Sequence, residues 1–201
     1  MRNGILLLVV CAIAAFALHR GRADAAGERV SAEQRAATLR FAPTVAPQDR
    51  AWILAAVASA RPEAQQLIAE VDGLVEIRTD LRDGQAIGMA EMTGGAATIS
   101  LDVVALNGER AVDRSVSVLH ELGHIVDFVL VEDELLNRLD QGIPRLGTPA
   151  PQERFAETFA KWALRGRVSI AGDGYGIPST ASLEDWGAPL GRLAIELDLK
   201  R

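Results

Sequence analysis

Residues 120–124 read His-Glu-Leu-Gly-His, and no other part of the chain has residue types and spacing so well suited to catalysis. Residues four apart lie on one face of an α-helix, so His120 and His124 could hold a metal ion between them. Glu121, beside the first histidine, could then reach a water molecule bound to that ion. The motif therefore predicts a site for one zinc ion.

A catalytic zinc site usually has three protein ligands and keeps a fourth position for water. The remaining histidine, His19, and the only cysteine, Cys11, both lie in an apolar leader, so the third ligand should be a carboxylate. The best candidates are Glu153 and Glu157, which share one face of a predicted helix. One could bind the metal, and the other could accept a hydrogen bond from a ligand histidine.

Other acidic residues have less specific patterns. Asp127 lies on the helix face of the two histidines and could support one of them, or could be a solvated surface residue. Glu157 could instead be a surface charge or pair with Lys161, four residues later. Asp173, in an Asp-Gly-Tyr-Gly segment, is a rival third ligand whose spacing fits less well.

The sequence HELGHIVD at 120–127, followed about 30 residues later by ERFAETFA at 153–160, resembles a known group of enzymes. It is similar to the Glu-ligand (gluzincin-like) zinc metallopeptidases, and most similar to lethal-factor-type catalytic domains. The resemblance covers residues 96–165. It implies that Glu153 binds zinc and that Glu157 supports a histidine. It also implies a zincin-like fold in which an edge strand, here residues 96–101, aligns an extended substrate by backbone pairing.

One feature of that group is missing. Lethal-factor-type domains carry a tyrosine shortly before the ligand glutamate, where it stabilises the developing oxyanion, and residues 146–150 contain none. Tyr175 is the only tyrosine of the chain, and it could serve from the C-terminal part. Otherwise an arginine, a backbone N–H or the metal alone must stabilise the oxyanion.

These features predict a zinc metalloendopeptidase that cleaves peptide or protein substrates, with Glu121 as the general base. Two alternatives stay open: a non-enzymatic zinc-binding envelope protein, and a zinc hydrolase of a non-peptide amide. Glu121 argues against the first alternative, because a structural zinc site does not need it. A closed structural site would also have a fourth protein ligand.

The helices and strands that must position these residues are predicted from hydrophobic periodicity and from residues that start or end such elements. Asp113 is a predicted cap for a helix that runs to about residue 131, and Pro151 begins a second helix that runs to about residue 164. Residues 172–189 are predicted to be irregular. Three strands are predicted at 74–78, 86–92 and 96–102, and further helices at 48–60, 62–73 and 190–199.

Residues 1–25 have the layout of a secretory signal peptide, with an apolar run from Gly4 to Leu18 and a small-x-small site at 23–25. We therefore predict a secreted or periplasmic protein, associated with a membrane only if the leader is not cleaved. Cleavage would take three Arg and one Asp from the chain, which changes the net charge from −6 to −8. A chain this acidic is a poor nucleic-acid binder, so no nucleic-acid partner is predicted.

The predicted fold is α+β and zincin-like, with a small mixed sheet over the two metal-binding helices. After the leader, residues 26–73 would form a helical N-terminal region. Residues 74–201 would form the metallopeptidase domain.

Overall fold

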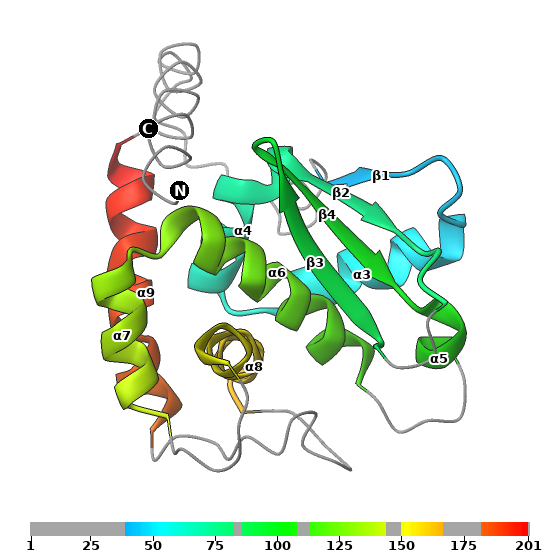
Figure 1. Cartoon of the computed structure of the whole chain (residues 1–201). Helices are drawn as coiled ribbons and strands as arrows, with labels where there is room; N and C mark the ends of the chain where they lie inside the picture. Colours follow the sequence, from blue (N-terminus) through cyan, green and yellow to red (C-terminus); the bar gives the residue numbers. More distant parts are fainter. Residues whose placement is uncertain (1–38, 83–85, 108–112, 144–149, 167–181, 201) are drawn as a thin grey trace, which may run out of the picture.

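The computed structural model describes residues 39–82, 86–107, 113–143, 150–166 and 182–200. Over these residues the chain has an α+β fold, as predicted, with seven α-helices and one four-stranded mixed sheet (Figure 1). The strands are β1 (Arg40–Phe41), β2 (Val75–Arg78), β3 (Gly88–Thr93) and β4 (Ala96–Leu101). The helices are α3 (Pro47–Ser59), α4 (Pro62–Val71), α5 (Val103–Asn107), α6 (Arg114–Leu130), α7 (Asp133–Gln141), α8 (Pro151–Ala163) and α9 (Leu183–Leu199).

The sheet has the strand order β1-β2-β4-β3. Strands β1, β2 and β4 are parallel, and β3 forms an antiparallel hairpin with β4. Gly94 and Gly95 make the hairpin turn with φ values of 59° and 84°, a conformation that glycine adopts without steric cost. The prediction that residues 96–101 form the edge strand is wrong. Strand β4 lies inside the sheet, and β3 forms the edge.

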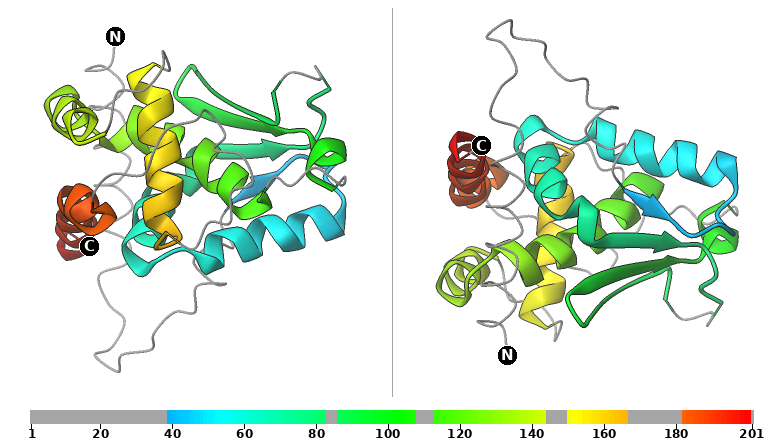
Figure 2. Two further views of the ribbon diagram at one scale, coloured as in Figure 1. Left: turned by 90° about the horizontal axis from the view of Figure 1, so that it is seen from below. Right: turned by 90° about the horizontal axis from the view of Figure 1, so that it is seen from above.

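One face of the sheet carries the buried side chains, and α6 packs against β3 and β4 on that face. Helix α3 packs beside α6, and the views of Figure 2 show both helices on the same side of the sheet. Directly opposite residues of an antiparallel pair project to one face. The inward positions of β3 are therefore Gly88, Ala90 and Met92, opposite Leu101, Ile99 and Ala97.

The two helices that carry the candidate ligands pack on each other. Asp113 caps α6 by accepting a hydrogen bond of 2.8 Å from the backbone N–H of Ser115, and Pro151 is the first residue of α8. Both helix starts agree with the sequence prediction. Helix α8 lies against α6 on the side away from the sheet, so of these two helices α6 is the one that packs against the strands (Figure 1).

Helix α9 begins well before the predicted residue 190. Ser182 caps it by accepting a hydrogen bond from the Asp185 N–H, and the helix continues through Pro189. A proline inside a helix costs about 3 kcal/mol or more. Tertiary packing offsets that cost here, because Trp186 and Leu190 are buried, and the Trp186 indole donates a 3.1 Å hydrogen bond to the Leu139 carbonyl of α7.

A single hydrophobic core connects all these elements. It runs from Leu39 through α3, α4 and the sheet to Ala194 of α9, so the helices before residue 74 share their core with the sheet. The predicted helix positions 48–60 and 62–73 agree with α3 and α4 to within a few residues. Among the described helices, none is both long enough and apolar enough to span a membrane. The predicted leader, residues 1–25, lies outside the described residues.

Candidate metal centre

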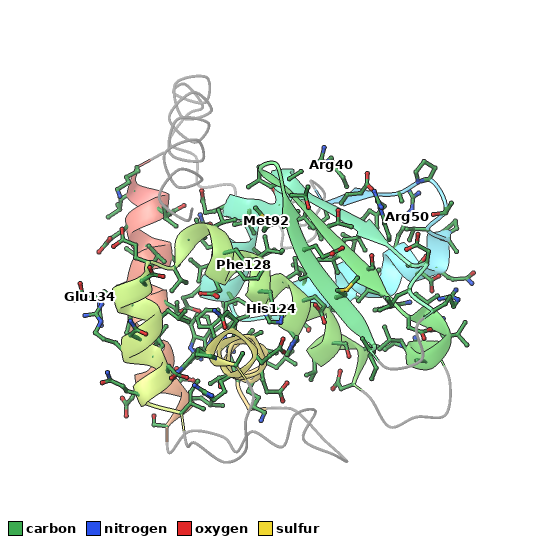
Figure 3. The ribbon with its side chains drawn as sticks, viewed as in Figure 1. Arg40, Arg50, Met92, His124, Phe128 and Glu134 are labelled. Atoms are coloured by element: carbon green, nitrogen blue, oxygen red, sulfur yellow. The ribbon has the colours of Figure 1, made fainter. Side chains whose placement is uncertain are left out.

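The two histidines and Glu121 lie in the most buried part of α6. Their residues are only 6–7% exposed. Leu119 and Leu122 of the same helix are fully buried in the core. Their burial fixes the rotation of α6 about its axis, and hence the direction in which the two histidines point. His124 also stacks on Phe128, with 5.9 Å between ring centroids, and Figure 3 shows both residues following α6 below Met92.

Glu153, in the first turn of α8, completes a group of three possible metal ligands with His120 and His124. The Nε2 atoms of the two histidines are 3.2 Å apart. Glu153 Oε2 lies 3.3 Å from His120 Nε2 and 3.6 Å from His124 Nε2. In a tetrahedral zinc site with bonds of about 2.0–2.1 Å, neighbouring donor atoms are roughly 3.3 Å apart. The observed separations of 3.2–3.6 Å are therefore compatible with a metal ion held at such bond lengths.

The chemistry of the three donors also fits a cation. Glu157 contacts His120 Nδ1, which favours the tautomer with its proton on Nδ1 and leaves the Nε2 lone pair facing Glu153 and His124. Glu153 Oε2 is buried and accepts no hydrogen bond of good geometry from the described residues. Three lone pairs converging at 3.2–3.6 Å repel one another unless a cation or a proton lies among them. The arrangement can thus bind a metal ion.

Gly123 lets the two helices approach closely enough to make this group. A Cβ atom at position 123 would lie 3.1 Å from Phe159 Cδ1 and 3.2 Å from Ala156 Cα, closer than ordinary van der Waals contact. Ala156 is three residues after Glu153 on the same face of α8. The small residue inside the HELGH motif therefore sets the distance between the Glu153 carboxylate and the histidines.

Glu157 is buried, with its side chain 3% exposed. Its Oε2 lies 3.3 Å from His120 Nδ1, and its Oε1 lies 3.3 Å from Lys161 Nζ. The two sequence interpretations of Glu157, as a partner of a ligand histidine and as a partner of Lys161, are therefore both present in the structure. The third interpretation, a solvated surface charge, is wrong.

Asp127 is 0% exposed, so the interpretation of this residue as a solvated surface group is also wrong. It lies on α6, three residues after His124, where a supporting role stays a prediction. Tyr175, the predicted oxyanion stabiliser, and Asp173, the rival ligand, both lie outside the described residues.

Glu121 points to β3, the strand at one edge of the sheet. A Cβ atom at Gly88, the first residue of β3, would overlap Glu121 Oε1 and lie 2.7 Å from its Cγ and Cδ. The Glu121 carboxylate therefore occupies the space that any other residue at position 88 would fill. Burial raises the pKa of Glu121 above its usual range, because the charged form loses hydration. Gly88 is a site residue that sequence analysis missed, since the contact depends on strand order.

The electrostatics of the metal-free centre favour a protonated His120. Burial disfavours the imidazolium, but the carboxylates of Glu153 and Glu157 outweigh this cost and raise the pKa of His120 to about 9. Contact with both histidines holds the pKa of Glu153 well below its usual range. Burial opposes ionisation of Glu157, but His120 and Lys161 outweigh that effect and lower its pKa.

A salt bridge anchors the first turn of α8. Arg154 donates from Nε and Nη2 to the two carboxylate oxygens of Asp140 on α7, at 2.7 and 2.8 Å. The pair is mostly buried. Because Arg154 follows Glu153 directly, this bidentate salt bridge also restrains Glu153, the candidate metal ligand. Sequence analysis did not find it, because nothing local relates residue 140 to residue 154.

Comparisons of the chain with protein-family models, with curated proteins and with solved structures gave no match. Its chemistry must therefore be inferred from the geometry of the centre and from the motifs in its sequence.

Proposed function

We propose that this protein is a zinc-dependent metallopeptidase of the Glu-ligand type, with a zincin-like fold. The observation that carries the proposal is the convergence of one carboxylate and two imidazoles at zinc-like separations, beside a buried glutamate that is not part of the donor group. His120, His124 and Glu153 would hold the ion. Zinc bound there would activate a water molecule and polarise the scissile carbonyl.

The roles of the other residues follow from their positions. Glu121 accepts a proton from the attacking water and delivers it to the leaving amine, for which its raised pKa is favourable. Glu157 orients His120 through the Nδ1 contact. The edge of β3, which no strand of the described residues covers, pairs with an extended peptide, and β3 begins at Gly88 against the Glu121 carboxylate. We further propose that the protein is exported, on the basis of its leader.

The first experiment tests the general base. Purified wild-type protein and Glu121→Gln would be compared for zinc content by mass spectrometry and for cleavage of a quenched-fluorescent peptide library. We expect equal zinc content, with the variant slower by a factor of roughly 10²–10⁴. Chelation should abolish wild-type cleavage, and zinc should restore it. Undiminished turnover in zinc-loaded Glu121→Gln would refute the mechanism, and hydrolysis of non-peptide amides alone would change the substrate class.

The second experiment tests the ligand assignment. Glu153→Ala should lose zinc, whereas Glu157→Ala should keep a more weakly bound ion, because only the Glu153 carboxylate faces both Nε2 atoms. Zinc retained in Glu153→Ala and lost in Glu157→Ala would reverse the two roles.

A further inference from the structure

Lys161 is a buried cation next to the metal centre, and the proposed chemistry does not use it. Its side chain is 4% exposed, and its Nζ lies 3.3 Å from Glu157 Oε1. Removing an ammonium group from water costs several kcal/mol, whereas an exposed pair at the same helical spacing contributes only about 0.2–0.5 kcal/mol. Replacing a whole buried ion pair by apolar residues of similar volume is often neutral or stabilising. The position of Lys161 thus calls for an explanation other than stability.

The geometry around Glu157 supplies that explanation. A carboxylate has two oxygens, and here each contacts a different group: Oε1 contacts Lys161 and Oε2 contacts His120 Nδ1. The attraction between the Lys161 ammonium and Oε1 restrains the rotation of the carboxylate, with Oε2 directed at the imidazole. Lys161 and Glu157 are four residues apart on α8, whereas His120 is on α6, so the contact between Glu157 and His120 joins the two ligand-bearing helices.

We propose that Lys161 is a positioning residue for the metal centre, which acts on His120 through Glu157. It holds the Glu157 carboxylate in the orientation that keeps the Nδ1 proton of His120 engaged and its Nε2 lone pair directed at the donor group. The inference rests on the proposed zinc centre. It adds a third residue, beyond the ligand and its carboxylate partner, on which zinc affinity depends.

A double-mutant cycle tests this proposal. Zinc dissociation constants would be measured by competition with a chromophoric chelator for wild type, Lys161→Met, Glu157→Gln and the double variant. Loss of a partner of a metal-bound histidine typically weakens metal binding 10–100-fold. We expect Lys161→Met to weaken zinc binding about tenfold, and no more than Glu157→Gln does, since it acts through that residue. In the Glu157→Gln background, Lys161→Met should change the dissociation constant less than twofold.

Two results would overturn the proposal. One is zinc binding by Lys161→Met within twofold of wild type, and the other is an equal loss in both backgrounds. If Lys161→Met alone does not fold, a change of more than twofold between Glu157→Gln and the double variant would still overturn the proposal, because Lys161 would then act without the Glu157 carboxylate. A wild-type protein that binds no zinc would refute the metal centre itself, which separates that failure from a failure of the positioning role.

Arg61→Met is the matched control. Arg61 is also a mostly buried cation, it lies over the Trp162 ring of α8 at 4.8 Å, and its carboxylate partner Glu184 is on α9, away from the centre. This variant should lose stability without a change in zinc affinity. An equal loss of zinc affinity in Arg61→Met and Lys161→Met would mean that any buried cation packed against or within α8 has the same effect, and would also refute the proposal.

Discussion

Replacing Gly123 with alanine should weaken zinc binding about tenfold while leaving the protein folded. The added methyl group would lie 3.1 Å from Phe159 Cδ1, 3.2 Å from Ala156 Cα and 3.4 Å from the Ala156 carbonyl oxygen. Ordinary contacts between such atoms are about 3.5–4.0 Å, so α8 must move away from α6 by roughly 0.3–0.4 Å. The nearest main-chain atoms belong to α8, and they cannot rotate aside as a flexible side chain could.

The effects on stability and on zinc affinity have different physical causes. Alanine is favoured over glycine in a helix by about 1 kcal/mol, whereas overpacking a core typically costs 1–3 kcal/mol, so the net destabilisation should be about 0–2 kcal/mol. Zinc sites tolerate errors of only about 0.2 Å in ligand distance. A displacement of α8 moves Glu153 with it, since Ala156 is on the same helix face. We expect the zinc dissociation constant to rise about tenfold, which corresponds to 1.4 kcal/mol.

The assay compares zinc affinity by chelator competition with the urea-induced unfolding of the metal-free protein. Gly73→Ala is the control, because a Cβ atom at Gly73 would have no neighbour within 4 Å, and its zinc affinity should equal that of wild type. If Gly123→Ala bound zinc as tightly as wild type, the close approach of α6 and α8 would not set the donor geometry. The explanation given for the glycine in the motif would then be incorrect.

Three further predictions concern the surroundings of the centre. Gly88→Ala should keep zinc but lower kcat by a factor of about 10–100, because its methyl group displaces the Glu121 carboxylate; unchanged kcat in a peptide-cleavage assay would contradict this contact. In the metal-free protein the pKa of His120 is raised to about 9, so its contribution of roughly 3 kcal/mol should be fully present below pH 6.5 and lost as pH rises through about 9. Denaturant unfolding of chelated protein at pH 6 and at pH 9.5 measures this difference, and equal stabilities would be the contrary result. Asp140→Asn should destabilise the protein by about 2 kcal/mol because it breaks a mostly buried pair with Arg154; a change below 0.5 kcal/mol in urea unfolding would show that this pair is not an anchor.

The helices that carry the donor group could be predicted because their signals are local. Asp113 and Pro151 mark the two starts, and the i, i+4 spacing of the histidines identifies one helix face. The sequence could suggest that Glu153 lies near the two histidines, but it could not give the distance between them. That distance depends on how closely α8 approaches α6. The approach is set by the contact of Gly123 with Ala156, two residues that are far apart in the sequence.

The burial of Lys161 and the extent of α9 had no usable local signal. A lysine four residues after a glutamate is most often a solvated pair on a helix surface. Its burial here results from the packing around α8. Pro189 and the nearby glycines predicted an irregular segment, but Trp186 and Leu190 bury enough apolar surface to hold that segment in a helix.

Strand order had the largest effect on the interpretation of the site. The resemblance to zinc metallopeptidases implied that residues 96–101 form an edge strand, yet β4 pairs in parallel with β2 and takes an interior position. The edge belongs to β3, whose register with β4 places Gly88 opposite Leu101, on the face that contacts Glu121. Because side chains alternate along a strand, a slip of one residue would direct the side chain of Met89 to that place. The Gly94–Gly95 turn fixes the register, so the hairpin is a determinant of whether the Glu121 carboxylate fits at all.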